Sequence, residues 1–435
     1  MKRPSFIVSV IALLVLCSNH AAVHAEEPDF LLGRLVERGI LTADEADALR
    51  REQQQTEWQR QEQLNQQVKG NVFELPKPLK GLTVGMLGYL DFSAGDLPEF
   101  NDQDESFNAF RVTRGYLTVK KEITSQLHAR VTLDAHQDGT GDYKARLKYY
   151  YAEWRPHDFA FLTDMKSEIG MGHMPWLDFE EHVNPYRCQG TMAVERAGVF
   201  NSSDLGVSLR GNFFGKVFDA KDRLGNDHYD GRWGTWHVGL YNGSGYHAVE
   251  ENCNKAIEGR FTVRPLPDFL PGLQLSYLGI HGDGNMDYPS GWPDYDVNMT
   301  MLSYQQPWLV LTAQYFATKG NAKGTWVDAA GNALDTAGYS FFTNLRIPIG
   351  ARKLWWFARY DHFDQDVDAR IASNAYYDMW ITGLAYYLTG ENLIMVVYEG
   401  TDYGAGANKK GHAPNPAETR LGNDQKVQVV MQVKF

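Results

Sequence analysis

The sequence has few cysteines and only one long apolar run. Three of its 435 residues are cysteines, which excludes a small secreted scaffold held together by disulfides. Outside the amino terminus, no stretch approaches the roughly 20 consecutive apolar residues that a membrane-spanning helix needs. The sequence therefore excludes a helical membrane protein.

Catalytic motifs and an excess of positive charge are also missing. There is no phosphate-binding loop, no G-x-S-x-G, no H-E-x-x-H and no pair of CxxC motifs. The formal net charge of −12 argues against a nucleic-acid partner. Asp178, Glu180 and His182 fall in a predicted loop, where solvated side chains are a commoner explanation than catalysis. We expect no catalytic residue, no metal site and no cofactor.

The first 25 residues have the parts of a secretory signal peptide. A basic start is followed by an apolar run over Phe6–Cys17 and by Val23-His24-Ala25, with a small residue at the expected cut site. We predict cleavage after Ala25. Cys17 does not favour lipidation, because the preceding residue is Leu16 rather than a small residue.

Residues 26–80 differ from the rest of the chain. They are rich in Gln, Glu, Arg and Leu and show no period-2 alternation. A short helix is predicted over Phe30–Arg38, ended by Gly39, and Thr42 with Glu45 forms the capping-box signature of a second helix. Two interpretations stay open for this periplasmic segment, a coiled coil and a solvated helical spacer.

The carboxy-terminal strand indicates the fold of residues 81–435. Over Val427–Phe435, one face of an extended strand is fully apolar and the other mostly polar. A terminal aromatic such as Phe435 is characteristic of bacterial outer-membrane barrels. The alternative, a water-soluble sandwich, would place the same apolar faces in its core.

Strand count and loop lengths favour the barrel. An even number of strands, with short turns at one end and long loops at the other, is expected of a transmembrane antiparallel β-barrel, and we predict such an all-β barrel of about 16 strands in the bacterial outer membrane. The link 214–231 breaks the pattern, because it is long where a short turn is expected. The candidate strands cover about residues 81–93, 106–120, 124–136, 145–156, 165–176, 203–213, 232–242, 256–265, 272–283, 295–305, 308–318, 337–347, 352–363, 376–388, 391–401 and 424–435.

Assigning the polar strand faces to the interior makes the predicted pore basic. The basic residues placed inside are Arg130, Arg146, Lys148, Arg210, Arg260, Arg264, Arg346, Lys353, Arg359 and Lys426, against Asp134, Glu258, Asp296 and Asp361. Fixed charges on a low-dielectric wall act strongly on a passing ion, so an anion preference is expected. A slip of one residue would turn any of these strands inside out.

The third outer loop is expected to fold inward and narrow the pore. Its charged residues include His182, Arg187, Glu195 and Arg196, and its acids provide an alternative in which the constriction prefers cations. Cys188 in this loop and Cys253 in the next face an oxidising exterior, and we predict a disulfide between them, with two isolated thiols as the alternative.

Several blocks resemble the phosphate-selective porin O and P family. They are Phe107–Ala135, Ile169–Trp176, Met192–Gly211, Val238–Gly245 and the helical opening FLLGRLVERGILTADEADAL. The resemblance implies a trimeric, sixteen-stranded porin. Met171 and His173 stand where the family tends to have glutamine and lysine, so phosphate specificity does not carry over.

These observations predict an outer-membrane porin through which small ions or anionic solutes diffuse passively. A barrel of about sixteen strands leaves an aqueous channel. The expected partners are membrane lipid, small solutes and two further copies of the chain. Two alternatives remain, an outer-membrane barrel hydrolase and a structural barrel that holds a partner protein.

Overall fold

The computed structural model describes residues 35–42, 44–46, 48–49, 52, 79–348 and 353–435. The chain divides into two compact units, Met1–Pro78 and Leu79–Phe435. The predicted signal peptide and most of the predicted second helix lie outside the described residues.

The described part of the first unit contains the junction between its two predicted helices. Gly39 has a positive φ of 69°, and its amide donates to the carbonyl of Val36 at 3.0 Å, as at the end of a helix. The Thr42 amide donates to the Glu45 carboxylate at 2.8 Å, and the Glu45 amide donates to the Thr42 hydroxyl at 3.3 Å. These reciprocal bonds are those of a capping box.

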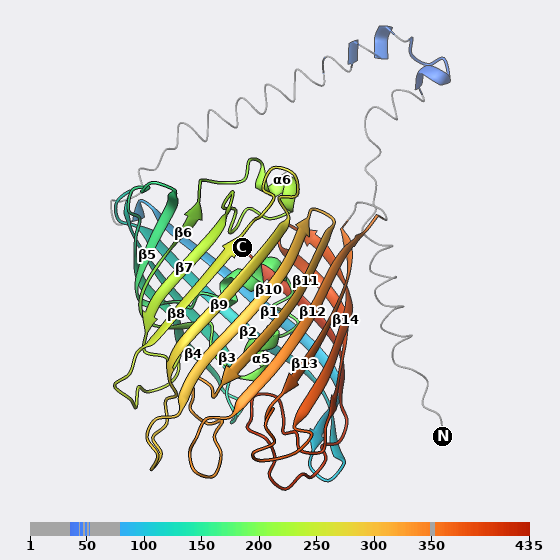
Figure 1. Ribbon diagram of the computed structural model, residues 1–435. Coiled ribbons are helices and arrows are strands. Elements are labelled where there is room, and N and C mark those ends of the chain that lie inside the picture. The colour runs from blue at the N-terminus through green and yellow to red at the C-terminus, as the bar shows by residue number, and fades with distance from the viewer. Residues whose placement is uncertain (1–34, 43, 47, 50–51, 53–78, 349–352) are drawn as a thin grey trace, which may run out of the picture. The chain divides into compact units, whose positions relative to one another are not determined.

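The second unit is a closed antiparallel barrel of sixteen strands, which confirms the predicted fold class and strand count (Figure 1). Each strand pairs with its neighbours in sequence, and β1 pairs with β16 to close the barrel. The strands are β1 (Leu82–Glu99), β2 (Gln103–Glu122), β3 (Leu127–Gln137), β4 (Tyr143–Trp154), β5 (Leu162–His173), β6 (Ser203–Phe213), β7 (Gly234–Tyr241), β8 (Ala256–Val263), β9 (Leu273–Asp283), β10 (Asp294–Gln306), β11 (Leu309–Lys319), β12 (Asp335–Ile347), β13 (Leu354–Asp364), β14 (Tyr376–Thr389), β15 (Asn392–Tyr403) and β16 (Asp424–Lys434).

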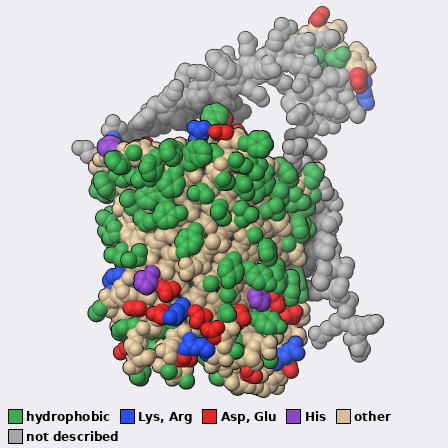
Figure 2. All heavy atoms as spheres, viewed as in Figure 1, with side chains coloured by type: hydrophobic (Ala, Val, Ile, Leu, Met, Phe, Trp, Pro, Cys, Tyr) green, Lys and Arg blue, Asp and Glu red, His purple; other side chains and the backbone are tan. Residues whose placement is uncertain are grey.

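The outer face of the barrel is apolar over a broad band. Figure 2 shows hydrophobic side chains gathered around the visible face, with charged side chains concentrated towards the end that carries the long loops. On β16, Met431 is 37% exposed whereas Gln428 and Gln432 are buried, so the apolar face of this strand points outward as predicted. Among the described residues, no helix is long and apolar enough to span a bilayer.

The interior is not polar all round, which differs from the simple two-face prediction. On β10, β14 and β15 the inward faces are also largely apolar, and Phe316 on β11 joins them; Met299, Phe316 and Met379 are each at most 1% exposed. These side chains belong to one hydrophobic cluster with residues of the loop between β5 and β6. Half of the barrel is therefore filled by packed side chains.

The predicted inward position of Asp296 is wrong for the same reason. The inward face of β10 is formed by apolar side chains such as Val297 and Met299, so Asp296 points outward. There it makes an ion pair with His281 at 2.6 Å.

The link 214–231, which was an exception to the predicted loop pattern, is also long in the structure. The link between β6 and β7 stays long at the end of the barrel where Phe435 and the short turns lie, and it contains the short helix α6 (Ala220–Leu224) (Figure 1). No pair of strands was missed there.

Candidate functional site

The loop between β5 and β6, residues 174–202, folds into the barrel, and we call it loop 3. It contains the helices α4 (Leu177–Val183) and α5 (Ala193–Ala197). Most of its apolar side chains are buried, including Trp176 and Leu177 at 0% exposure. Burial of each large apolar side chain contributes about 1.5–3 kcal/mol, so the loop has a strong reason to stay inside.

Polar contacts join loop 3 to residues of β12, β13 and β15. The Tyr186 hydroxyl donates to Asn344 Oδ1 at 2.9 Å, and Arg196 forms an ion pair with Glu399 at 2.7 Å. Arg359 Nη1 donates to the carbonyl oxygen of Thr191 at 3.0 Å. Loop 3 is therefore attached to these three strands.

Three of the predicted pore-lining arginines are buried: Arg260 and Arg359 contact loop 3, whereas Arg264 contacts the link between β6 and β7. Arg260 is fully buried and donates to the carbonyl of Pro175 at 2.8 Å. Arg264 is 1% exposed and donates to the carbonyl of Gly231, while Arg359 is 6% exposed and pairs with Asp361 at 2.7 Å. Their inward direction was predicted, but the loops cover them.

A cavity of about 1400 Å³ lies between loop 3 and the wall formed by the first six strands. It is bordered at the short-turn end by residues such as Lys353 and Phe435, and it reaches inward to Tyr89, Tyr116 and Arg187. Of the ten basic residues predicted to line the pore, Arg130, Lys148, Arg210 and Lys353 border it. Arg146 shares Asp134 with Arg114, and Arg346 donates to the carbonyl of Pro307 in a turn.

Several cations lie on the strand wall of the cavity, and three of them, Lys120, Arg130 and Lys148, lie on β2, β3 and β4. Lys120 on β2 lies opposite Arg130 on β3 in the strand register. The Arg130 guanidinium lies 4.4 Å from the centre of the Tyr149 ring, and Lys148 Nζ lies 4.5 Å from that of Tyr116. Within the described part of the chain, no salt bridge joins any of the three to a carboxylate.

Lys120 borders the cavity but was not among the residues predicted to line the pore. On β2, Leu117 is outward-facing and 45% exposed, whereas Tyr116, Thr118 and Lys120 border the cavity. The alternation could have assigned Lys120 to the interior. The irregular register near Arg114 obscured it, because β2 gains a residue there relative to β1.

The loop 3 side of the cavity carries acids that have partners. Arg187 contacts the carboxylates of Glu181 at 3.0 Å and Glu195 at 3.6 Å. Of the four predicted constriction residues, His182 and Arg187 border the cavity, whereas Glu195 and Arg196 act as partners of Arg187 and Glu399.

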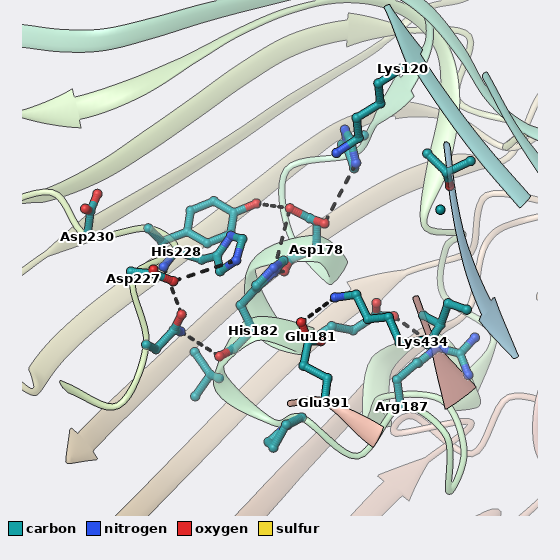
Figure 3. A pocket seen from close by; sticks show the side chains of 18 of the residues that line it. Lys120, Asp178, Glu181, His182, Arg187, Asp227, His228, Asp230, Glu391 and Lys434 are labelled. Atoms are coloured by element: carbon teal, nitrogen blue, oxygen red, sulfur yellow. Dashed lines mark hydrogen bonds and ion pairs between the residues drawn. The ribbon is translucent and has the colours of Figure 1, made fainter. Parts of the chain in front are cut away.

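Asp178 is the third acid on this side, and Figure 3 shows it among the residues that line the cavity. It accepts a hydrogen bond from the Tyr229 hydroxyl and lies 3.8 Å from His173. Burial opposes ionisation of this carboxyl group, but His173, His182 and Arg210 together hold its pKa well below the usual value. The negative charge of Asp178 is therefore balanced by neighbouring basic side chains.

Glu180 faces away from the water-filled cavity. It is 7% exposed and accepts a hydrogen bond from Trp176 Nε1 at 2.7 Å. Burial raises the pKa of Glu180 to about 7. It therefore contributes less negative charge than its position in an acidic loop implied.

The predicted disulfide between Cys188 and Cys253 is wrong. Both are free thiols, and Cys188 is buried whereas Cys253 is exposed. Cys188 is carried inside the barrel by loop 3, while Cys253 stays in the outer loop after β7. Burial raises the pKa of the Cys188 thiol to about 12.

Comparisons with known proteins identify the fold. No family model and no curated protein matches the chain. Among solved structures, an anion-selective porin from Comamonas acidovorans has a TM-score of 0.53 at 11% identity, with 81% of this chain and 99% of that chain covered.

Two further structures have similar scores. OmpF of Salmonella typhi, solved with daunomycin, gives a TM-score of 0.52 at 12% identity over 81% of this chain and 97% of its own. OprB of Pseudomonas putida gives 0.51 at 10% identity over 82% of this chain and 96% of its own. The chain has the fold of the bacterial outer-membrane porins.

Proposed function

We propose that this barrel is a passive diffusion channel for small hydrophilic solutes that prefers anions. The observation that carries the proposal is the wall of Lys120, Arg130 and Lys148, which have no carboxylate partner among the described residues. Cations on a low-dielectric wall concentrate their field in the adjacent water and attract passing anions.

The acids opposite this wall do not cancel it. Glu181 and Glu195 share Arg187, and Asp178 is surrounded by His173, His182 and Arg210. Glu181, Glu195 and Asp178 thus each lie beside a cation outside the trio, whereas none of the three wall cations forms a salt bridge with a described carboxylate. This balance supports anion preference in a chain whose net charge is −12.

Conductance in a planar bilayer tests the proposal. The purified full-length protein should form open channels whose zero-current potential in a potassium chloride gradient has the sign of chloride preference. A hydrolase or a barrel that holds a partner should be nearly silent in this assay. An open channel that prefers potassium would overturn the charge argument while leaving the channel proposal intact.

We propose membership of the phosphate-selective porin O and P family on the sequence blocks alone, and with it a trimer. We expect a solute other than phosphate, because His173 stands where the family tends to have lysine. His173 is buried between Glu168 at 2.9 Å and the Arg130 side chain at 3.2 Å. Inorganic phosphate at millimolar concentration should therefore not block the chloride current. Chemical crosslinking in detergent should yield trimers.

A further inference from the structure

The long connection between β6 and β7 folds against loop 3. We call residues 214–233 the periplasmic turn. Its helix α6 is held by a small apolar cluster of Val217, Ala220 and Leu224, all at most 6% exposed. The periplasmic turn thus has a helix and an apolar cluster of its own, unlike the two-residue connection at 307–308.

Three residues of the periplasmic turn contact α4 directly. The Tyr229 hydroxyl donates to the Asp178 carboxylate, and Asn226 Nδ2 donates to the carbonyl oxygen of His182 at 2.7 Å. The rings of His228 and His182 lie with their centres 4.0 Å apart. Asp178, His182 and His228 are seen together in Figure 3, and the ring centres of Tyr229 and His182 lie 5.7 Å apart.

A buried arginine joins the same helix to the barrel wall. The Arg260 guanidinium lies 4.3 Å from the ring centre of Phe179 on α4 and 5.1 Å from that of Tyr229 on the turn. A cation stacked on aromatic rings is attracted most strongly when it is desolvated, as Arg260 is here. The helix α4 is therefore held between the wall and the periplasmic turn.

The same turn residues form part of the passage. Asn226, His228 and Tyr229 border the cavity, as do Lys216 and Lys221 nearer the start of the turn. Lys148 and Arg187 border the same cavity. The turn therefore both positions α4 and shapes the inner end of the channel.

We propose that the periplasmic turn keeps the passage beside loop 3 steadily open by fixing α4, and with it Asp178 and Glu181, opposite the basic wall. This inference rests on the proposed channel function. Tyr229 and Asn226 are the positioning residues. Without their hydrogen bonds, α4 keeps its apolar contacts but loses the two polar contacts that set its distance from the wall.

Two variants test the inference. In Tyr229→Phe combined with Asn226→Ala, α4 should fluctuate, so that brief current steps in single-channel records become roughly tenfold more frequent, as expected for the loss of two hydrogen bonds. The matched control is Tyr277→Phe, which removes a lipid-facing hydroxyl that donates to Asn298 at 2.7 Å and should leave the records unchanged.

Hydrogen exchange of the amides of 177–183 gives a readout that does not depend on conduction. Exchange should be roughly tenfold faster in the double variant than in the wild type and the control. If the wild-type barrel does not conduct but the α4 amides exchange faster in the double variant, the channel proposal is wrong and the positioning role of the turn is supported. Unchanged exchange together with unchanged current steps would overturn the inference.

Tyr229→Phe alone covers the case in which the double variant does not fold. It keeps the ring that packs on Phe179 and Arg260 and removes only the hydroxyl. Exchange of the α4 amides should rise roughly threefold or more. No change in this single variant would also overturn the inference.

Discussion

Lys120 of β2 lies directly across from Arg130 of β3, and both side chains enter the cavity that runs beside loop 3. Two adjacent cations repel each other, so their proximity costs free energy unless an anion is present. Neither has a salt bridge to a carboxylate in the described residues. This pair, with Lys148, is the feature from which the selectivity of the channel is inferred.

The first prediction concerns these wall cations. Replacing Lys120, Arg130 and Lys148 together with glutamine should move the zero-current potential towards cation preference, because the paired acids of loop 3 remain. Lys319→Gln is the control, since Lys319 lies at the outer rim in an ion pair with Asp294. An unchanged potential in the triple variant would show that other charges govern selectivity.

The second prediction concerns the attachment of loop 3. Arg196 and Glu399 form an ion pair in which the side chains are 11% and 4% exposed. Arg196→Met should leave the Glu399 carboxylate buried with less compensation and weaken the attachment by about 3 kcal/mol. Loop 3 should then be cut by protease faster, while the folded barrel still migrates faster in SDS than the heat-denatured chain.

An exposed ion pair supplies the control for this experiment. Arg420 and Asp102 are about 70% exposed and 3.7 Å apart. Arg420→Met should change loop 3 cleavage very little, because exposed pairs contribute about 0–1 kcal/mol. Equal effects of the two substitutions would contradict the anchoring role of Arg196.

The sequence predicted the barrel well, because lipid imposes a strict alternation on every strand. The apolar row of β16 and the total of sixteen strands both follow from that rule. The rule fails where both faces of a strand are apolar. On β10, Met299 and Met301 pack on the inward side, so alternation of polar and apolar residues no longer marks the interior.

The site was less predictable, because it depends on where one loop packs. Trp176, Leu177 and Phe179 are buried by the packing of loop 3, but nothing in the sequence indicated which part of the barrel the loop would fill. Arg260 and Arg359 were therefore assigned to the pore although the loop covers them. Pairing between distant segments decided their role.

The third prediction concerns pH. Burial lowers the pKa of His228 below its ordinary value of about 6.5, and His182 lowers it further, while Asp178, Asp227 and Glu391 oppose the shift. A depressed histidine pKa means that the unfolded turn binds more protons, so the stability of the contact rises with pH and is lost as pH falls below about 6.5.

Hydrogen exchange of the amides of 177–183 should therefore be faster at pH 5.5 than at pH 7.5, after correction for the intrinsic effect of pH on exchange. In His228→Asn, which cannot titrate in this range, the corrected difference should shrink. A wild-type contact equally protected at both pH values would contradict the assignment.

The fourth prediction concerns the two thiols. In the folded protein a maleimide should label the exposed Cys253 rapidly and the buried Cys188 slowly or not at all. After denaturation without reductant, both should react. Failure of both to react under those conditions would indicate a disulfide and contradict the free thiols.

The most direct test of the account is the zero-current potential of the wild-type channel in a tenfold potassium chloride gradient at neutral pH. The unpaired cations Lys120, Arg130 and Lys148 predict a potential with the sign of chloride preference. A potential of the opposite sign, from a barrel that conducts, would contradict the central claim and assign selectivity to the acids of loop 3.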